Sequence, residues 1–319
     1  ILEKEPHTRG SYCKDQGIDK PFIVDEQVPN MYCFFIWTGI AAITLISVEL
    51  FHGLVYCPMI YRDLKIHPIA CELYRIIGSF VLGATFTMGI TEMVKVTIGE
   101  FRPHFLSLCH MNKDSCNDTD WNSHFNFSTS CSNPSDFNLS YEEWAKKLID
   151  ARKSFLSGHS SFSFFSAVFL ALYLKSRLSQ LRTKERYMGN KRGLIWAEWI
   201  LMGLKVLRPF LQFSYLALAF FIAMSRVSDY YHHPRDVISG GLLGTLGAYL
   251  TYTEIAQLDN KPRVFHSLNY KTNPMTDLEM EDIYRNKKAL SKTAVSETDP
   301  LNQERELNET SNDHQITVV

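Results

Sequence analysis

The sequence lacks an excess of charge of either sign. Its 319 residues contain 33 Lys and Arg against 34 Asp and Glu, so the formal net charge is −1. A protein that binds nucleic acid needs surplus basic side chains to neutralise phosphates. The balance therefore argues against nucleic acid as the main partner.

Cysteine is scarce, and a signal-peptide pattern is missing from the N-terminus. Seven Cys exclude a dense disulfide scaffold and leave room for one or two bridges. The sequence begins at Ile1 rather than Met, and no secretory leader opens it. We expect that further N-terminal sequence precedes Ile1.

The hydrophobic residues, 45% of the total, are gathered in five long runs. These runs cover residues 31–48, 76–91, 155–174, 209–225 and 237–253. A soluble protein buries one such run as a core helix, whereas five in one chain are typical of a membrane protein. The runs lack alternation, which disfavours strands. The sequence predicts an all-α, polytopic bundle of transmembrane helices.

Basic residues after the third run indicate the orientation in the membrane. Residues 175–192 include seven Lys and Arg, and short loops of this kind belong on the cytoplasmic side. The loop 95–158 and the segment 1–30 are then expected outside the cell or in a lumen. Residues 193–207 are apolar but interrupted by charge, and we expect an interfacial or helix-extending segment there. The polar region 256–319 is expected to be a disordered cytoplasmic tail.

The loop between the second and third runs has two features of an extracellular or lumenal segment. It contains the glycosylation sequons at Asn117, Asn126 and Asn138. Four cysteines are expected on this side and could form two disulfides in three connectivities. They are Cys13, Cys109, Cys116 and Cys131.

Three short polar clusters border the runs on the same side of the membrane. The first contains Lys95 and Arg102, and the second is Ser157-Gly158-His159 at the start of the third run. Taken singly, a lysine at a helix end is usually a snorkelling residue, and a Ser-Gly pair is often only a cap. A helix N-terminus with a glycine is also a good phosphate site.

The third cluster joins the last two runs. It contains Arg226, His232, His233 and Asp236, and Pro234 suits the first turn of the final helix. Ionisable residues at a membrane face are costly and tend to be functional. The three clusters together favour phosphoryl transfer without a metal or other cofactor, in which cations hold the phosphate and histidines perform the chemistry. No HExxH, Walker loop or paired CxxC suggests a competing site.

The order K-x6-RP, SGH and SR-x5-H-x3-D resembles the three signature motifs of the type 2 phosphatidic acid phosphatase (PAP2) superfamily. The flanking segments KVTIGEFRPHFLSLC, FLSGHSSFSFF and SRVSDYYHHPRDV are similar to those of the animal lipid phosphate phosphatases. The resemblance extends from about Arg9 to the end of the last run. It implies six spans with both termini cytoplasmic, of which the first would precede Ile1.

The resemblance also implies a role for each motif residue. His232 would be the nucleophile that forms a phosphohistidine, Asp236 would orient it, and His159 would be the general acid and later the base. His233 matches no catalytic position, and Leu156 replaces the proline common before Ser-Gly-His. The residues expected to hold the phosphate are Lys95, Arg102, Ser157, Gly158 and Arg226.

The expected function is that of a metal-independent lipid phosphate phosphatase. Its substrates would be phosphatidate, lysophosphatidate, sphingosine 1-phosphate or ceramide 1-phosphate, hydrolysed at the plasma membrane or in the endoplasmic reticulum or Golgi. The partners would be membrane lipids, with a homo-oligomer left open. The alternatives are a catalytically silent, plasticity-related signalling or scaffold relative, which should lack motif residues, and a sugar-phosphate phosphatase of the endoplasmic reticulum. A transporter would need polar residues along the spans.

Overall fold

The computed structural model describes the helical part of the chain and the segments that cover one of its ends. The described residues are 5–9, 11–12, 15–56, 68–109, 124–125, 131, 140–187 and 195–257. They belong to one compact unit, Ile1–Pro262. The three sequons, Cys13, Cys116 and all but the first two residues of the predicted tail lie outside the described residues.

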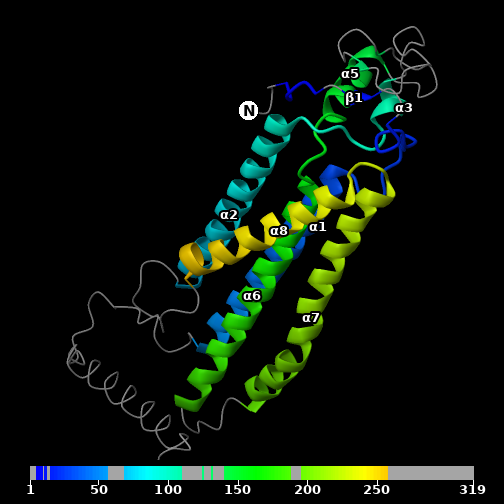
Figure 1. The fold of residues 1–319 in the computed structure, drawn as a ribbon. Coiled ribbons are helices and arrows are strands. Elements are labelled where there is room, and N and C mark those ends of the chain that lie inside the picture. The colour runs from blue at the N-terminus through cyan, green and yellow to red at the C-terminus, as the bar shows by residue number, and fades with distance from the viewer. Residues whose placement is uncertain are drawn as a thin grey trace, which may run out of the picture. The chain divides into compact units, whose positions relative to one another are not determined.

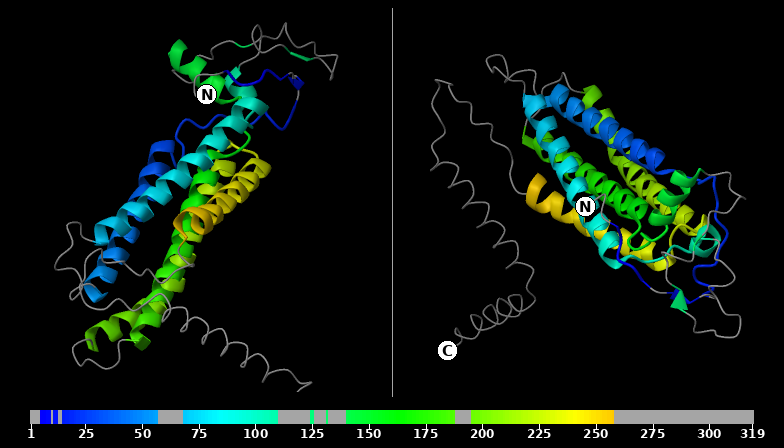
Figure 2. Two further views of the ribbon diagram at one scale, coloured as in Figure 1. Left: turned by 90° about the vertical axis from the view of Figure 1, so that its left-hand side faces the viewer. Right: turned by 90° about the horizontal axis from the view of Figure 1, so that it is seen from above.

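Five long helices make up the bundle within this part of the chain. They are α1 (Asn30–Tyr56), α2 (Pro68–Ile98), α6 (Gly158–Tyr187), α7 (Ile195–Ser228) and α8 (Pro234–Leu250), which continues into the π-helical turn η3 (Thr251–Ala256). Helix α6 contacts each of the other four (Figure 1). Seen from above, α1 and α8 lie on opposite sides of α6 (Figure 2). Each helix overlaps one predicted run, which confirms the predicted all-α bundle.

The five helices differ in how well they suit a bilayer by themselves. Three contain stretches long and apolar enough to cross it, at Asn30–Phe51, Ile69–Ile98 and Met202–Ser228. Helix α6 has a polar second half and is enclosed by its neighbours, and α8 has only 17 residues. The outer face of α8 is nevertheless apolar, with Ile238, Leu242 and Leu246 exposed. Exposed apolar side chains on a transmembrane bundle face lipid rather than water.

Helices α6 and α8 approach each other closely because α8 carries glycines on the shared face. A Cβ on Gly240 would lie 2.6 Å from the carbonyl oxygen of Ser157. A Cβ on Gly244 would overlap the carbonyl oxygen of Ser161. Only a residue without a side chain fits at such distances. The contact holds the first turns of α6 and α8 side by side, and both carry motif residues.

One end of the bundle is covered by short elements; we call it the site end, where α2 and α7 end and α1, α6 and α8 begin (Figure 1). The short elements are α3 (Phe105–Cys109), α5 (Tyr141–Asp150) and the antiparallel pair β1 (Ser11–Tyr12) and β2 (His124–Phe125). This pair of two-residue strands was not predicted. Cys109 and Cys131, two of the four candidate cysteines, form a disulfide in this layer.

The opposite end of the bundle is held by a buried charge network. Arg177 of α6 donates to Glu49 of α1 from its Nε at 2.7 Å, and its Nη2 lies 3.0 Å from Glu72 of α2. Tyr173 donates a further hydrogen bond to Glu49 at 3.0 Å. Buried ionised groups require such pairing. The network connects three helices at the end of the bundle farthest from the motif residues.

Candidate functional site

The structure brings the three predicted clusters together at the site end. Lys95 lies in the last turn of α2 and approaches Gly158, the first residue of α6. A Cβ added to Gly158 would be 3.1 Å from the Nζ of Lys95. The backbone N–H of Ser157 donates to the carbonyl oxygen of Asp236 at 3.2 Å. Residues more than 130 positions apart in the sequence therefore share one site.

The ring of His232 is held in a single tautomer by a backbone group. Its Nδ1 lies 2.7 Å from the carbonyl oxygen of Ser154. A carbonyl oxygen can only accept a hydrogen bond, so Nδ1 carries the proton. The lone pair of the neutral ring is then on Nε2, which is the form that a nucleophilic histidine needs.

The environment of His232 also favours the neutral ring. Burial lowers the pKa of His232 to about 4. The proximity of Asp236 opposes this change, whereas the charges of Arg102 and Lys95 add to it. His232 is therefore unprotonated at neutral pH, and its lone pair is available.

Asp236 lies near both histidines of the third cluster. Its Oδ2 accepts hydrogen bonds from Ser154 Oγ at 2.6 Å and from the backbone N–H of His233 at 3.0 Å. The same oxygen is 3.9 Å from Nδ1 of His232 and 3.3 Å from Nδ1 of His233. Ser154 contacts both residues, through its carbonyl oxygen to His232 and through its Oγ to Asp236, and the orienting role of Asp236 stays a prediction. The contact with Asp236 raises the pKa of His233.

His159, in the first turn of α6, is held in the opposite tautomer. Its Nε2 lies 3.0 Å from the carbonyl oxygen of Val28. The same reasoning places a proton on Nε2, because the carbonyl can only accept. The two histidines of the site therefore differ at Nε2: His232 has a lone pair there and His159 has a proton.

Each of the three expected phosphate-binding cations has a carboxylate partner. Lys95 pairs with Glu92 at 2.5 Å, as its position one turn away allows, and Arg102 pairs with Asp150 at 2.8 Å. Arg226, which is fully buried, is held by two acids. Glu26 lies 2.7 Å from its Nη1, and Asp229 lies 2.8 Å from its Nη2.

Tyr231 lies between the two guanidinium groups of the site. Its ring centre is 5.2 Å from Cζ of Arg102 and 5.6 Å from Cζ of Arg226. Both distances suit a cation–π contact. Both guanidinium groups thus contact the same ring, which belongs to the residue before His232.

The N-terminus of α6 adds backbone donors to these cations. Helix α6 begins at Gly158, and the side chain of Ser157 accepts a hydrogen bond from the N–H of Ser160 at 3.4 Å. A 30-residue helix presents its positive dipole end and free N–H groups here. Such an end suits a bound anion.

One group of side chains at the site could hold a metal ion by geometry alone. Ligand atoms of Glu100, His233 and Asp236 lie within 4.8 Å of one another. Glu100, however, forms an ion pair with Arg235, and Asp236 accepts three hydrogen bonds from Ser154 and His233. The cluster is therefore already engaged in contacts within the chain, and metal independence remains a prediction.

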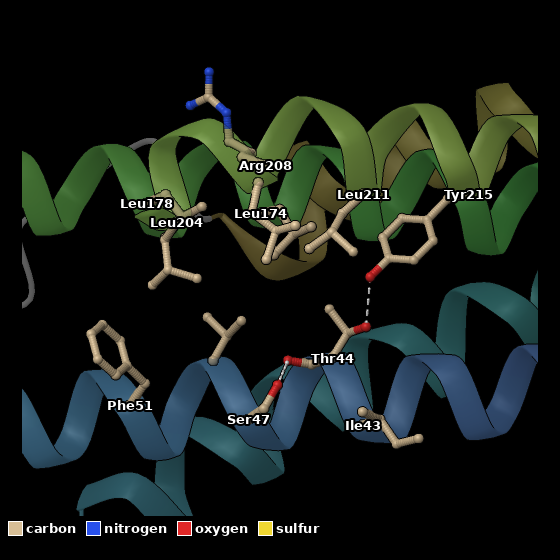
Figure 3. A pocket seen from close by; sticks show the side chains of 12 residues that line it. Ile43, Thr44, Ser47, Phe51, Leu174, Leu178, Leu204, Arg208, Leu211 and Tyr215 are labelled. Atoms are coloured by element: carbon tan, nitrogen blue, oxygen red, sulfur yellow. Dashed lines mark hydrogen bonds between the residues drawn. The ribbon is translucent and has the colours of Figure 1, made fainter. Parts of the chain in front are cut away.

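A separate cavity of about 360 Å³ lies between α1, α6 and α7 (Figure 3). Leu174, Leu204 and Leu211 are among the mainly apolar residues that line it, and Thr44 and Tyr215 are hydrogen bonded at one side, 2.8 Å apart. None of the motif residues lines this cavity. The candidate site is therefore the cluster at the site end.

Sequence reasoning missed the residues that support the motifs. Ser154, Glu26, Asp150 and Asp229 all contact motif residues, yet none was predicted to do so. Asp229 lies within the third motif and Ser154 three positions before the second, which was a usable signal. Glu26 lies 200 positions from Arg226, and no local pattern connects them.

Comparisons with known proteins agree with the motifs. The pattern of the PAP2 superfamily matches residues 76–258. Phospholipid phosphatase 2 of Mus musculus is 30% identical over 92% of this chain and 88% of its own length. Phospholipid phosphatase 1 of Rattus norvegicus is 32% identical over 77% of this chain and 74% of its length. A Drosophila melanogaster relative is 30% identical over 82% of this chain, which spans 65% of that protein. No solved structure matches the chain significantly.

Proposed function

The chain belongs to the PAP2 superfamily, and from this premise we propose that it is a membrane-embedded lipid phosphate phosphatase that works through a phosphohistidine. Its substrates are phosphate monoesters such as phosphatidate, lysophosphatidate, sphingosine 1-phosphate or ceramide 1-phosphate. The observation that carries the proposal is the pair of opposite tautomers. A nucleophile with a free Nε2 and an acid with a protonated Nε2 lie beside three cations.

In the first step, the phosphate binds to Lys95, Arg102 and Arg226 and to the N-terminus of α6. Nε2 of His232 attacks phosphorus, and the bond from phosphorus to the alcohol oxygen breaks. His159 enters this step with both ring nitrogens protonated; it gives its Nε2 proton to the departing oxygen, which leaves as the alcohol, and the ring of His159 is left neutral. The cations stabilise the charge on the phosphoryl oxygens during the transfer.

In the second step, water replaces the alcohol. The neutral His159 takes a proton from the water, and the hydroxyl oxygen attacks phosphorus while the bond to His232 breaks. Inorganic phosphate and the starting enzyme result. Through both steps the carbonyl of Ser154 keeps Nδ1 of His232 as the donor, and the nearby Asp236 stabilises the positive charge of the phosphorylated ring.

The test is phosphate release from purified protein in detergent with excess chelator. The panel contains the four lipid phosphates and glucose 6-phosphate. We expect release from the lipids without added metal. Release from glucose 6-phosphate alone would favour the sugar-phosphate alternative, and no release from any substrate would favour the silent relative. Loss in chelator with recovery in magnesium would contradict metal independence.

A further inference from the structure

The cavity between α1, α6 and α7 lies far from the candidate site, toward the other end of the bundle (Figure 3). Its lining residue Leu174 comes 16 positions after Gly158, the first residue of α6. Leu211 comes 17 positions before Ser228, the last residue of α7. A rise of about 1.5 Å per residue puts both roughly 25 Å from the site end. In a hydrocarbon core about 30 Å thick, the cavity therefore lies in the leaflet opposite the site end.

The wall of the cavity suits hydrocarbon rather than water. Its hydroxyl groups already have partners: Thr44 and Tyr215 share a hydrogen bond of 2.8 Å, and Ser47 donates to the carbonyl oxygen of Thr44 at 3.2 Å. The other lining residues, Arg208 excepted, are apolar. An apolar cavity of about 150 Å³ stays dry and binds benzene, and this one measures about 360 Å³. Ile43 and Ser47 line it and are exposed, so an acyl chain can enter from the bilayer.

Arg208 is the charged residue that lines this apolar space. It lies 20 positions before Ser228 in α7, which is about 30 Å from the site end. Figure 3 shows its guanidinium pointing away from α1, outside the cavity that its stem lines. Within the described part of the chain, its Nε is buried without a hydrogen-bond partner and no acidic side chain pairs with it. Arg177 of α6, at a similar depth, is by contrast paired with Glu49 and Glu72.

A lipid phosphate matches this guanidinium in charge and in position. Arg208 lies about one hydrocarbon thickness from the site end, which is the level of the headgroups of the opposite leaflet. Guanidinium groups bind phosphate oxygens through paired hydrogen bonds, and basic residues at a membrane surface attract anionic lipids. A lipid at this level has its phosphate next to Arg208 and an acyl chain beside the cavity. One molecule can therefore match both the charge and the apolar wall.

We propose that the cavity binds an anionic phospholipid of the leaflet opposite the site end, with one acyl chain between α1 and α7 and the phosphate at Arg208. The lipid is a ligand and not a substrate, since about 30 Å separate its phosphate from His159. The chain contributes most of the affinity through buried hydrocarbon, and Arg208 contributes the preference for an anionic headgroup. A zwitterionic lipid has the same chains but carries a cation that opposes Arg208. The proposal is independent of the proposed function, because no motif residue lines the cavity.

The test compares two short-chain lipids on the purified full chain in detergent. Dioctanoyl phosphatidylserine is anionic and dioctanoyl phosphatidylcholine is zwitterionic, and neither is a phosphate monoester. Affinity is measured by thermal stabilisation, which requires no turnover. We expect the wild type to bind the serine lipid about fivefold more tightly, the usual contribution of one basic residue at a lipid surface. Glycerophosphoserine, which has the headgroup without the chains, should stabilise the protein far less.

Two pairs of variants assign the binding to this cavity. Arg208→Gln should abolish the fivefold preference. Lys175→Gln removes an exposed charge at a similar depth that does not line the cavity, and it should retain the preference. Val48→Trp fills the cavity and should weaken the binding of both lipids by about tenfold. Leu50→Trp adds the same bulk at an exposed position of α1 and should leave both affinities unchanged.

An unchanged preference in Arg208→Gln, or an equal loss in Lys175→Gln, would overturn the inference. So would wild-type affinity for both lipids in Val48→Trp, because the chain would then bind elsewhere. Stabilisation by glycerophosphoserine as strong as that by the lipid would show a site for a free phosphate compound instead. Should Val48→Trp give little folded protein, Ser47→Trp at an exposed position of the same wall should weaken the binding of both lipids in its place.

Discussion

His232 and His159 are prepared for opposite roles by the backbone carbonyls that they contact. The carbonyl oxygen of Ser154 accepts a hydrogen bond from Nδ1 of His232. The carbonyl oxygen of Val28 accepts one from Nε2 of His159. Neither contact depends on a charged side chain. Proton placement is therefore set by the path of the backbone around the two rings.

Substitution of each histidine should have a different effect on the phosphoenzyme. His232→Ala lacks the proposed nucleophile, so no phosphoenzyme should form. His159→Ala keeps the nucleophile but loses a proton donor worth about 10²–10⁴-fold in rate. An activated ester such as p-nitrophenyl phosphate needs little protonation to depart, so His159→Ala should still form phosphoenzyme from it. Acid-labile, base-stable trapping of labelled phosphate on purified variants measures this difference.

The adjacent histidine provides the control for this experiment. His233→Ala should keep most of its activity, because His233 points toward the carbonyl oxygen of Gly17 rather than toward the cations. Labelled phosphate on His232→Ala together with none on His233→Ala would show that the nucleophile is the other member of the pair.

Buried neutral histidines should make the protein less stable in acid. Burial lowers the pKa of His104 to about 3 and that of His232 to about 4. The unfolded chain, with a pKa near 6.5, binds more protons below that pH, so stability is complete above pH 6.5 and declines as pH falls toward 4. Each histidine should cost roughly 2–3 kcal/mol at pH 4.5. Thermal unfolding in detergent between pH 7 and 4.5 measures the decline.

A variant of His104 separates this effect from general acid denaturation. Nδ1 of His104 lies 2.9 Å from the carbonyl oxygen of Tyr230. The variant His104→Gln keeps a hydrogen-bond donor there but has no titrating ring. The pH dependence of its unfolding temperature should be shallower than that of the wild type. An equally steep dependence would mean that other groups cause the acid instability.

At the scale of elements, the apolar runs predicted where the helices lie but not how they pack. Every predicted run overlaps a helix, and the apolar stretch 193–207 proved to be helix-extending, since α7 is continuous from Ile195 to Ser228. The α6–α8 contact was not predictable, because glycines at 240 and 244 look like ordinary small residues of a membrane helix. The contact of Glu26 with Arg226 depends on this packing and could not be predicted before it.

Replacement of Gly244 should separate α6 from α8. Its Cβ would overlap the carbonyl oxygen of Ser161, and backbone cannot move aside as a side chain can. We expect Gly244→Ala to destabilise the protein by about 1–3 kcal/mol through overpacking. Activity should fall by about 10²-fold, because His159 and Asp236 lie at the starts of these helices and catalysis tolerates little misplacement.

The matched control is Gly89→Ala on the exposed face of α2. A Cβ there would meet no atom within 4 Å, and alanine is the better helix former. This variant should be as stable as the wild type or slightly more so, with unchanged activity. Equal losses in both variants would contradict a specific α6–α8 contact. Unfolding temperature and phosphate release measure the two effects.

For the whole molecule, the motif residues and the disulfide between Cys109 and Cys131 lie at the same end of the bundle. We predict that this end is extracellular or lumenal, with sugar on one or more of Asn117, Asn126 and Asn138. Replacement of all three by Gln should increase gel mobility, and wild-type protein treated with a glycosidase should match it. An unglycosylated wild type from eukaryotic membranes, or a tail cleaved by external protease in intact cells, would contradict this orientation.

Helix α6 is held at two points, at its first turn and at Arg177 in its second half. Arg177 is paired with Glu49 and Glu72 at one point, and the glycine face of α8 holds the first turn at the other. A helix held in this way cannot slide along its axis, so His159 stays at a constant distance from the charge network. In a bilayer, this constant distance fixes the depth at which His159 lies. For the proposed lipid phosphatase, the site then accepts phosphates that are presented at one depth, and acyl chains of different length should meet the same chemistry as long as their phosphates lie at that depth.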